Sequence, residues 1–253
     1  MALQPNVVNG ISRFIGDNTS EFITLSPGQL ANIPGGAWFL GGNDTVIGSA
    51  DSELILGNEG QDSISGGAGN DTLIGGKDND FVDGGIGSDS IRGDANEDII
   101  RGGDENDSLF GGKGNDQLFG DAGDDFLSGD QGNDTLTGGL GNDRFVLSTG
   151  GGLDIITDFG NGSDFIQVPA GVNISDILIQ AAGVNTLLSV RSTGEQLAQL
   201  NNVPASSITT TRLLLPNQPL LESPGTVNTP GQPPQPSDPI PVLPNLPLPG
   251  ISL

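Results

Sequence analysis

Two chemically opposite positions recur every nine residues between residues 39 and 146. The eighth place of every nine-residue copy holds a large apolar residue: Val46, Ile55, Ile64, Leu73, Val82, Ile91, Ile100, Leu109, Leu118, Leu127, Leu136 and Phe145. The sixth place of every copy holds an acidic residue: Asp44, Glu53, Asp62, Asp71, Asp80, Asp89, Asp98, Asp107, Asp116, Asp125, Asp134 and Asp143. Low-complexity segments have a biased composition without a fixed phase. Twelve copies held in phase therefore indicate a repetitive fold.

The clearest copy, GGAGNDTLI at residues 66–74, fits the pattern G-G-x-G-x-D-x-U-x, in which U is a large apolar residue. Such copies run without interruption from Gly48 to the copy that begins at Gly138, and a worn copy at 39–47 lacks the glycine pair. Glycine adopts positive φ and allows close backbone approach, so the first half of each copy predicts a turn. The last three residues predict a three-residue strand whose middle side chain points inward.

One such strand cannot bury its apolar residue alone, so two consecutive copies are expected to form one coil of 18 residues. Coils of this kind stack at the strand spacing of roughly 4.8 Å. Twelve copies then make six coils. The predicted fold is all-β: a parallel β-roll, that is, a right-handed β-solenoid of 18-residue coils, with Ile, Leu and Val from two facing sheets inside.

An 18-residue coil sorts the sixth-position acids into two rows, in which neighbours stand one coil apart. Such rows repel unless a cation lies between the carboxylates. Calcium suits this role because it takes six to eight oxygens from carboxylates and carbonyls. Zinc and copper suit it poorly, because the chain has no Cys and no His. Each inner acid should serve one ion on each side, so Asp89 would share ions with Asp71 and with Asp107.

The charge of the repeats agrees with this interpretation. Residues 39–146 hold 23 Asp and Glu against 5 Lys and Arg, a net charge of −18. Six acids leave five gaps in each row, so we expect about ten Ca²⁺, which would nearly cancel that charge. The simpler alternative is that the acids form a solvated acidic surface. Such a surface needs only scattered acids, whereas these acids recur every nine residues after a glycine turn, which favours calcium.

Residues 40–168 resemble the RTX (repeats-in-toxin), or haemolysin-type calcium-binding, family. The copies GGAGNDTLI, GGKGNDQLF and GDQGNDTLT match its nonapeptide, and GGLGNDRFVLSTGGGLDIITDF at 138–159 is similar to the exit of such arrays into a C-terminal cap. The resemblance implies a β-roll, calcium held by the sixth-position acids and backbone carbonyls, and export by a type I secretion apparatus. After a two-residue slip, residues 150–156 resemble one more copy, which makes Asp154 a further candidate ligand.

The flanks divide the chain into four expected parts. Residues 1–38 should form an N-terminal cap, with strands at Ser12–Ile15 and Glu21–Leu25. The roll follows at 39–146. Residues 147–215 should form a small antiparallel cap over the last coil, with strands at Asp164–Val168, Ile174–Ile179, Thr186–Val190, Leu197–Leu200 and Ile208–Leu215. Residues 216–253 hold twelve of the seventeen prolines and should be a disordered tail that serves as linker, partner ligand or export signal.

Composition narrows the function. A net charge of −24 argues against nucleic acid and anionic membrane surfaces as partners, and no segment predicts a membrane span or a Sec-type signal peptide. No His and no Cys removes the Ser-His, Cys-His and zinc chemistries, and 38 residues before the array are too few for a catalytic domain. We expect a secreted or cell-surface structural protein, not an enzyme, that folds on calcium. A carboxylate-pair glycosidase and an adhesive or matrix module remain as alternatives.

The fourth place departs from glycine in four copies, at Asp51, Asp78, Asn96 and Glu105. Asp and Asn tolerate the left-handed region better than Glu does. A glycine in the fourth position adopts this region without strain, and every copy in residues 111–146 has one. We therefore expect this C-terminal part of the array to load calcium first. The seventh and ninth positions should point outward, where isolated apolar side chains are ordinary.

Overall fold

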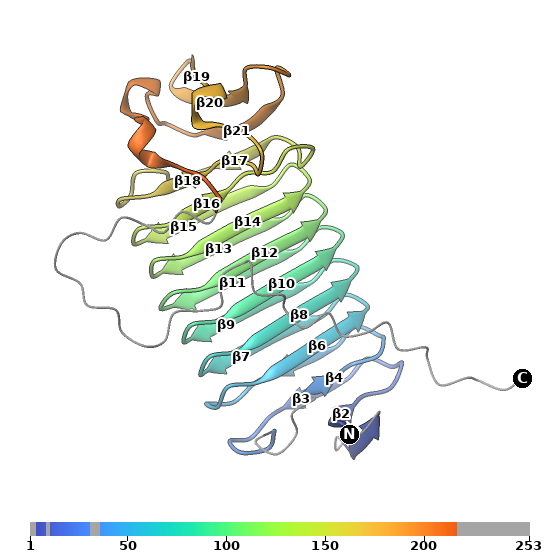
Figure 1. The fold of residues 1–253 in the computed structure, drawn as a ribbon. Helices are drawn as coiled ribbons and strands as arrows, with labels where there is room; N and C mark the ends of the chain where they lie inside the picture. Colours follow the sequence, from blue (N-terminus) through green and yellow to red (C-terminus); the bar gives the residue numbers. More distant parts are fainter. Residues whose placement is uncertain (1–3, 9–10, 31–35, 217–253) are drawn as a thin grey trace, which may run out of the picture.

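The chain forms an all-β parallel solenoid of about seven turns with almost no helix (Figure 1). The computed structural model describes residues 4–8, 11–30 and 36–216. The expected tail lies outside these residues, apart from Pro216. The predicted fold class is confirmed, whereas the four expected parts remain a prediction.

Each of the two sheets has eleven strands. The first is ordered as β1 (Gln4–Val8), β2 (Ile11–Ile15), β4 (Ala37–Trp38), β6 (Leu54–Glu59), β8 (Thr72–Lys77), β10 (Ser90–Ala95), β12 (Ser108–Lys113), β14 (Phe126–Gln131), β16 (Arg144–Val146), β18 (Phe165–Gln167) and β22 (Leu213–Leu214). The second is ordered as β19 (Ile177–Ala182), β20 (Asn185–Val190), β21 (Gln196–Leu200), β17 (Asp154–Ile156), β15 (Thr135–Leu140), β13 (Gln117–Ala122), β11 (Ile99–Asp104), β9 (Phe81–Ile86), β7 (Ser63–Ala68), β5 (Thr45–Ile47) and β3 (Phe22–Thr24).

Within each sheet of the array, every residue pairs with the residue one coil, or 18 positions, away. Ile91 of β10 pairs in parallel with Leu73 of β8 on one side and with Leu109 of β12 on the other. Eighth positions therefore stack on eighth positions along the roll. A slip of one residue would turn every apolar side chain outward, so the buried ladder itself specifies the register.

The strands of the array are longer than the three residues expected from the sequence. Strand β7, for example, covers the last three residues of one copy and the first three of the next. The ladder continues through the glycine pair because no side chain obstructs it: a β-carbon on Gly66 would stand 2.6 Å from the carbonyl oxygen of Gly84. The turn is thereby reduced to the fourth, fifth and sixth positions.

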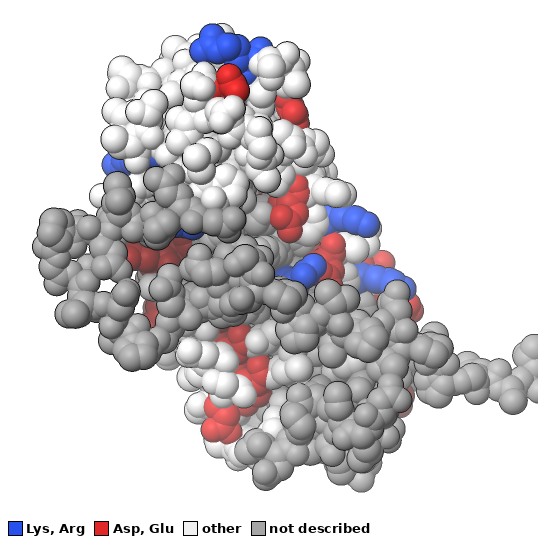
Figure 2. All heavy atoms as spheres, viewed as in Figure 1, with Lys and Arg blue, Asp and Glu red and all other residues white. Residues whose placement is uncertain are grey.

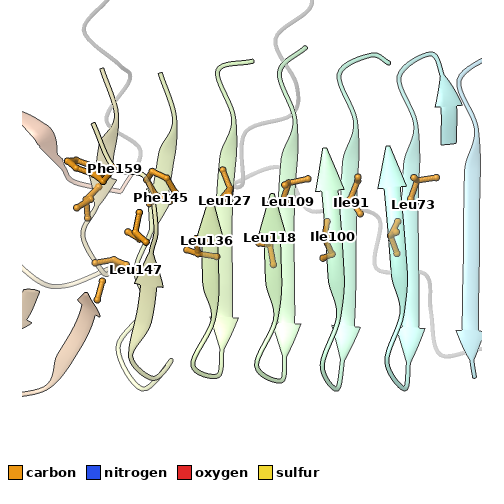
Figure 3. Close-up of a cluster of buried hydrophobic side chains, with 14 of the residues drawn as sticks. Leu73, Ile91, Ile100, Leu109, Leu118, Leu127, Leu136, Phe145, Leu147 and Phe159 are labelled. Atoms are coloured by element: carbon orange, nitrogen blue, oxygen red, sulfur yellow. The ribbon is translucent and has the colours of Figure 1, made fainter. Parts of the chain in front are cut away.

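The core is a ladder of eighth-position side chains from the two sheets (Figure 3). Val46 is 1% exposed and the other eleven are fully buried. Burying one such side chain stabilises the fold by about 1.5–3 kcal/mol. The predicted inside position is thus confirmed along the whole array.

The C-terminal strands differ in part from the expected antiparallel cap. Strand β20 is antiparallel to both β19 and β21, as predicted. In contrast, β18 and β22 continue the first sheet in parallel, and β21 joins β17 in parallel. Three short 3-10 helices complete this region: Ile174–Asp176, Ala205–Ser207 and Thr210–Arg212.

The N-terminal segment also extends the roll. Strand β2 pairs in parallel with β4, and β3 pairs in parallel with β5. Strand β1 closes this end as an antiparallel partner of β2. The described residues contain no helix with the length and apolar character that a membrane crossing requires.

Candidate metal centre

All thirteen acids predicted as ligands are buried. The exposed fraction is 7% for Asp154, 6% for Glu53 and 1–3% for the sixth-position Asp residues. Each stands immediately before the outward seventh position of a strand, so its side chain folds back into the turn. Charged side chains are almost never buried unless they are paired, so thirteen buried carboxyl groups require a balancing partner.

The acids form the two expected rows, and backbone hydrogen bonds hold neighbours one coil apart. The N–H of Asp71 donates to Oδ1 of Asp89 at 2.7 Å, and the N–H of Asp89 donates to Oδ1 of Asp107 at 2.7 Å. The same bond joins every pair of sixth-position acids that are 18 residues apart, at 2.7–3.0 Å. One oxygen of each such Asp is therefore occupied by the preceding coil.

The second carboxylate oxygen has no such partner. Oδ2 is buried without a hydrogen bond in Asp44, Asp62, Asp71, Asp80, Asp89, Asp98, Asp107, Asp116, Asp125 and Asp134. A buried polar atom without a partner costs about 1–3 kcal/mol, and more if it is charged. Ten such atoms in fixed positions are suited to bind a cation.

Glycines of the turns are approached by both the orphaned oxygens and backbone carbonyl oxygens. A β-carbon on Gly57 would stand 2.2 Å from Oδ2 of Asp62 and 2.5 Å from the carbonyl oxygen of Gly75 in the next coil. On the fourth position, a β-carbon on Gly87 would stand 2.0 Å from the carbonyl oxygen of Gly69 in the preceding coil. The turns thus direct carbonyl and carboxylate oxygens into the space between coils, which suits a hard cation such as calcium.

Burial changes the ionisation of these acids. Desolvation, and after it the neighbouring carboxylates of the same row, raise the pKa of Asp80 and of Asp107 to about 8. For Asp62 and Asp116 the pKa is raised to about 7, again chiefly by desolvation. Without a cation, these four carboxyl groups therefore bind protons at a higher pH than a free Asp does.

Two predicted ligands, Glu53 and Asp154, differ from the other acids in their hydrogen bonds or in their spacing along the row. Both carboxylate oxygens of Glu53 accept hydrogen bonds from Ser49, one from the backbone N–H at 3.2 Å and one from the hydroxyl group. Asp154 continues the row of Asp134 after a coil of 20 residues, because the N–H of Asp134 donates to its Oδ1 at 3.2 Å. Asp154 is thus placed where the worn copy at 150–156 predicted.

Sequence reasoning missed Asp164, which continues the other row. The N–H of Asp143 donates to its Oδ1 at 3.1 Å, and Asp164 is 2% exposed. Its second oxygen accepts the N–H of Gly160 at 2.5 Å, so it differs from the orphaned acids. The signal was present in FGNGSDFIQ at 159–167, where glycines hold the second and fourth places and Phe159 replaces the first.

The donor set is made of oxygen. The described residues contain no group of three or more His, Cys, Asp or Glu side chains suited to one metal. Backbone carbonyls must therefore complete any coordination shell. The residues present fit calcium, which accepts such mixed sets.

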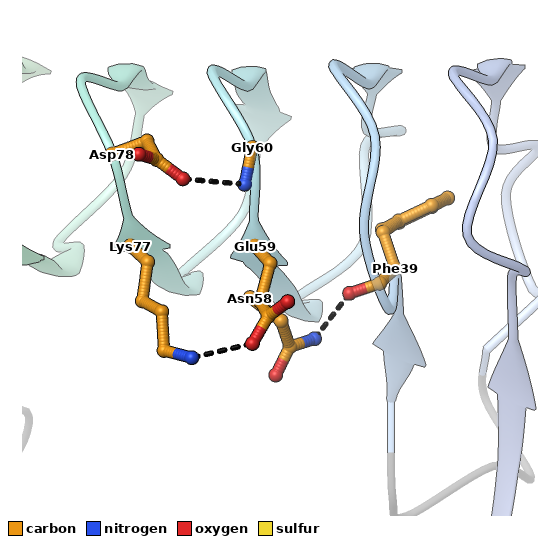
Figure 4. Close-up of polar contacts among 6 residues, drawn as sticks. All are labelled: Phe39, Asn58, Glu59, Gly60, Lys77 and Asp78. Atoms are coloured by element: carbon orange, nitrogen blue, oxygen red, sulfur yellow. Dashed lines mark hydrogen bonds and ion pairs between the residues drawn. The ribbon is translucent and has the colours of Figure 1, made fainter.

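Outside the acid rows, further polar contacts join neighbouring coils (Figure 4). Lys77 pairs with Glu59, but both side chains are more than 60% exposed, and such pairs contribute about 0–1 kcal/mol. Asp78, in the fourth position, accepts the N–H of Gly60 at 3.2 Å. Figure 2 shows further Asp and Glu at several levels of the roll.

The fold and the rows define a class: a parallel β-solenoid whose turns present buried acids and carbonyl oxygens to one another. The chain belongs to the RTX calcium-binding nonapeptide repeat (4 copies) family, whose sequence model matches residues 40–64, 56–91, 83–118, 92–127, 110–145, 119–156 and 128–166. These matches together span half of the 253 residues. The family resemblance seen in the sequence is thereby confirmed.

Two solved structures are similar to this chain. The AlgE6R3 subunit from the Azotobacter vinelandii mannuronan C5-epimerase is 27% identical, with 60% of this chain and 94% of that chain covered and a TM-score of 0.40. The extracellular lipase LipA from Serratia marcescens is 19% identical, with 76% of this chain and 42% of that chain covered and a TM-score of 0.31. No curated protein sequence matches the chain.

Proposed function

We propose that this protein is a secreted or cell-surface structural protein whose roll folds on extracellular calcium. The observation that carries the proposal is the set of ten buried Oδ2 atoms without a hydrogen bond, each held in a turn of the matched repeats. The thirteen acids from Asp44 to Asp154 would bind together with carbonyl oxygens of the turns. About ten ions would fill the gaps of the two rows.

The chain's own residues make folding depend on the ion. Without it, the acids must stay protonated or repel one another, and a glycine-rich backbone loses much entropy on ordering. Bound calcium would supply positive charge between the carboxylates, so its binding free energy becomes folding free energy. A low-calcium cytosol would keep the chain unfolded and ready for export through a type I apparatus.

The proposed function is tested by circular dichroism of the full chain in a chelator and in millimolar calcium. We expect a disordered spectrum in the chelator and β-structure with calcium. Magnesium at the same ionic strength is the control, because it demands a smaller, near-octahedral shell and dehydrates reluctantly. Full β-structure in the chelator at neutral pH would contradict the proposal.

We assign no catalytic role to the chain. The acids that a glycosidase would need are the ones proposed to bind calcium, and the composition lacks His and Cys. A surface or matrix partner is compatible with this function, and the outer face of the second sheet exposes neighbouring Phe81 and Ile99, 38% and 37% exposed.

A further inference from the structure

Residues 16–24 repeat the backbone contacts of the array although their sequence, GDNTSEFIT, lies outside every matched copy. Ile23 pairs with Val46 and is 5% exposed, so it stands in the eighth place of this segment. Counting back places Glu21 in the sixth position and Gly16 in the first. Glu21 and Asp44 are 23 residues apart instead of 18, so this segment cannot be recognised as a copy from the spacing in the sequence.

The first and sixth positions of this segment make the backbone hydrogen bonds that their counterparts make in the array. The N–H of Gly16 donates to the carbonyl of Trp38 at 2.7 Å, as the N–H of Gly48 does to the carbonyl of Ser65 at 2.7 Å. The carbonyl of Glu21 accepts the N–H of Thr45 at 2.8 Å, the contact that the sixth-position carbonyls make with the seventh position of the next coil.

The turn of this segment matches as well. Asn43 donates its N–H to the hydroxyl of Ser20 at 3.0 Å, and Gln61 donates its N–H to Oδ1 of Asn43 at 3.1 Å. A β-carbon on Gly42 would stand 2.9 Å from the carbonyl oxygen of Thr19, in the fourth position of this segment. The peptide that joins Thr19 to Ser20 therefore lies against the next coil, although its carbonyl oxygen is turned further from this point than the fourth-position carbonyl oxygens of the array are.

The acid row continues through Glu21. Its N–H donates to Oδ1 of Asp44 at 2.7 Å, the bond that links all neighbours in the rows. Oδ2 of Asp44 and Oε2 of Glu21 are both buried without a hydrogen bond, and Asp44 is 1% exposed. Oε2 also lies 2.7 Å from the point where Gly16 would carry a β-carbon, close to the placing of Oδ2 beside the first glycine of an array copy.

We infer that Glu21 and Asp44, with the carbonyl oxygens of the 16–24 turn, form an additional calcium site that extends one row beyond the array. The inference rests on the proposed function, because it assumes that the rows bind calcium. The site would bind the first folded coil to residues that the family repeat does not include.

The chain offers a built-in probe of this site. Trp38, whose carbonyl accepts the N–H of Gly16, is the only Trp, and the chain has no Tyr. Terbium(III) replaces calcium in oxygen sites and luminesces when an excited Trp lies close by. Tryptophan-sensitised emission therefore reports ions at this end of the roll.

The experiment compares Glu21→Gln with Glu59→Gln in the full chain. Glu59 undergoes the same change at the same end of the roll but lies on the surface, outside the rows. We expect E21Q to bind one calcium ion fewer per chain by equilibrium dialysis and to show reduced sensitised terbium emission, because the ion between Asp44 and Asp62 would remain. E59Q should keep both the wild-type stoichiometry and the wild-type emission.

The outcomes separate this inference from the proposed function. Wild-type stoichiometry and emission in folded E21Q would overturn the inference and leave the proposed function intact. A wild-type chain that takes up no calcium would overturn the proposed function itself. If E21Q does not fold in calcium, Glu21→Asp decides: recovered folding with the wild-type number of bound ions supports the site, and folding with one ion fewer and reduced emission overturns it.

Discussion

Gly66 and Asp71 face each other so closely that a β-carbon on Gly66 would stand 2.3 Å from Oδ2 of Asp71. Atoms in real structures do not approach so closely, so any side chain at this position must displace the carboxylate from the turn. The first glycine of a copy is thus required by the acid five residues later, and its conformational freedom is secondary.

Gly66→Ala should therefore weaken calcium-dependent folding. The overpacking penalty is about 1–3 kcal/mol, and the displaced carboxylate adds the loss of a ligand. A calcium titration followed by circular dichroism should show a higher midpoint. Gly41→Ala is the matched control, since its β-carbon would meet nothing nearer than 3.5 Å, and equal midpoints for the two variants would refute this account.

Leu73→Asp should abolish the roll, whereas Thr72→Asp should leave it folded. Leu73 is fully buried, and an unpaired carboxylate in its place would cost several kcal/mol. Thr72 precedes it on the outer face and is half-buried. Ser108, which the same reasoning placed outside, is only 8% exposed and makes a poorer control. Thermal unfolding in calcium would check the pair, and similar melting of both variants would invalidate the inside–outside assignment.

Asp89→Asn should remove or weaken two calcium sites in one row. Asp89 accepts the N–H of Asp71 and donates its own N–H to Asp107, so it borders two gaps. The site between Asp62 and Asp80 belongs to the other row and should remain. Equilibrium dialysis would count the ions. A loss confined to one ion would show that acids are not shared between neighbouring gaps.

The pH dependence of the metal-free protein should run opposite to that of most acidic proteins. Burial raises the pKa of Asp80 and Asp107 to about 8, well above the value of about 3.9 in an unfolded chain. A raised folded pKa gives stability that is full below the unfolded pKa and is lost as the pH rises through the folded one. In chelator, β-structure should thus increase as the pH falls from about 8 to about 5.

With calcium present, the direction should reverse, because protons compete with the ion for the same carboxylates. The calcium midpoint should rise as the pH falls. Circular dichroism across this range, with and without chelator, would measure both trends. Loss of β-structure on acidifying the metal-free protein would argue against the protonated rows.

The fourth position should set the order of loading. Asp78, Asn96 and Glu105 adopt φ of 70–79°, whereas Gly114, Gly123, Gly132 and Gly141 adopt φ of 140–153°. Non-glycine residues in the left-handed region carry strain, although the side chain of Asp78 offsets part of it by accepting the N–H of Gly60. Hydrogen exchange during a calcium titration should show protection first in about residues 111–146, and Glu105→Gly should advance protection around residue 105. Uniform protection along the array would contradict this order.

The inward and outward positions of the roll could be predicted from the sequence, because apolar and acidic residues recur at fixed places of the repeat along the whole array. Leu73 and Asp71 illustrate these two places. The sequence did not reveal Glu21 and Asp164, because their coils have 23 and 21 residues and their copies lack the glycine pair. Only the backbone pairing restores their register. The parallel placing of β18 and β22 was missed for a similar reason: short alternating strands carry no sign of their direction.

Because strands of the array pair at a constant step of 18 residues, the length of the roll is set by the number of its coils. Removing residues 84–101 would join a ninth position to a first one and shorten the molecule by one strand spacing, roughly 4.8 Å, with both ends keeping their relative orientation. Removing only nine residues would exchange the two sheets beyond the cut. The strands β19–β21 would then lie on the opposite side of the roll relative to β1 and β2. The roll can therefore be shortened or lengthened without rotating one end against the other only in steps of a whole coil.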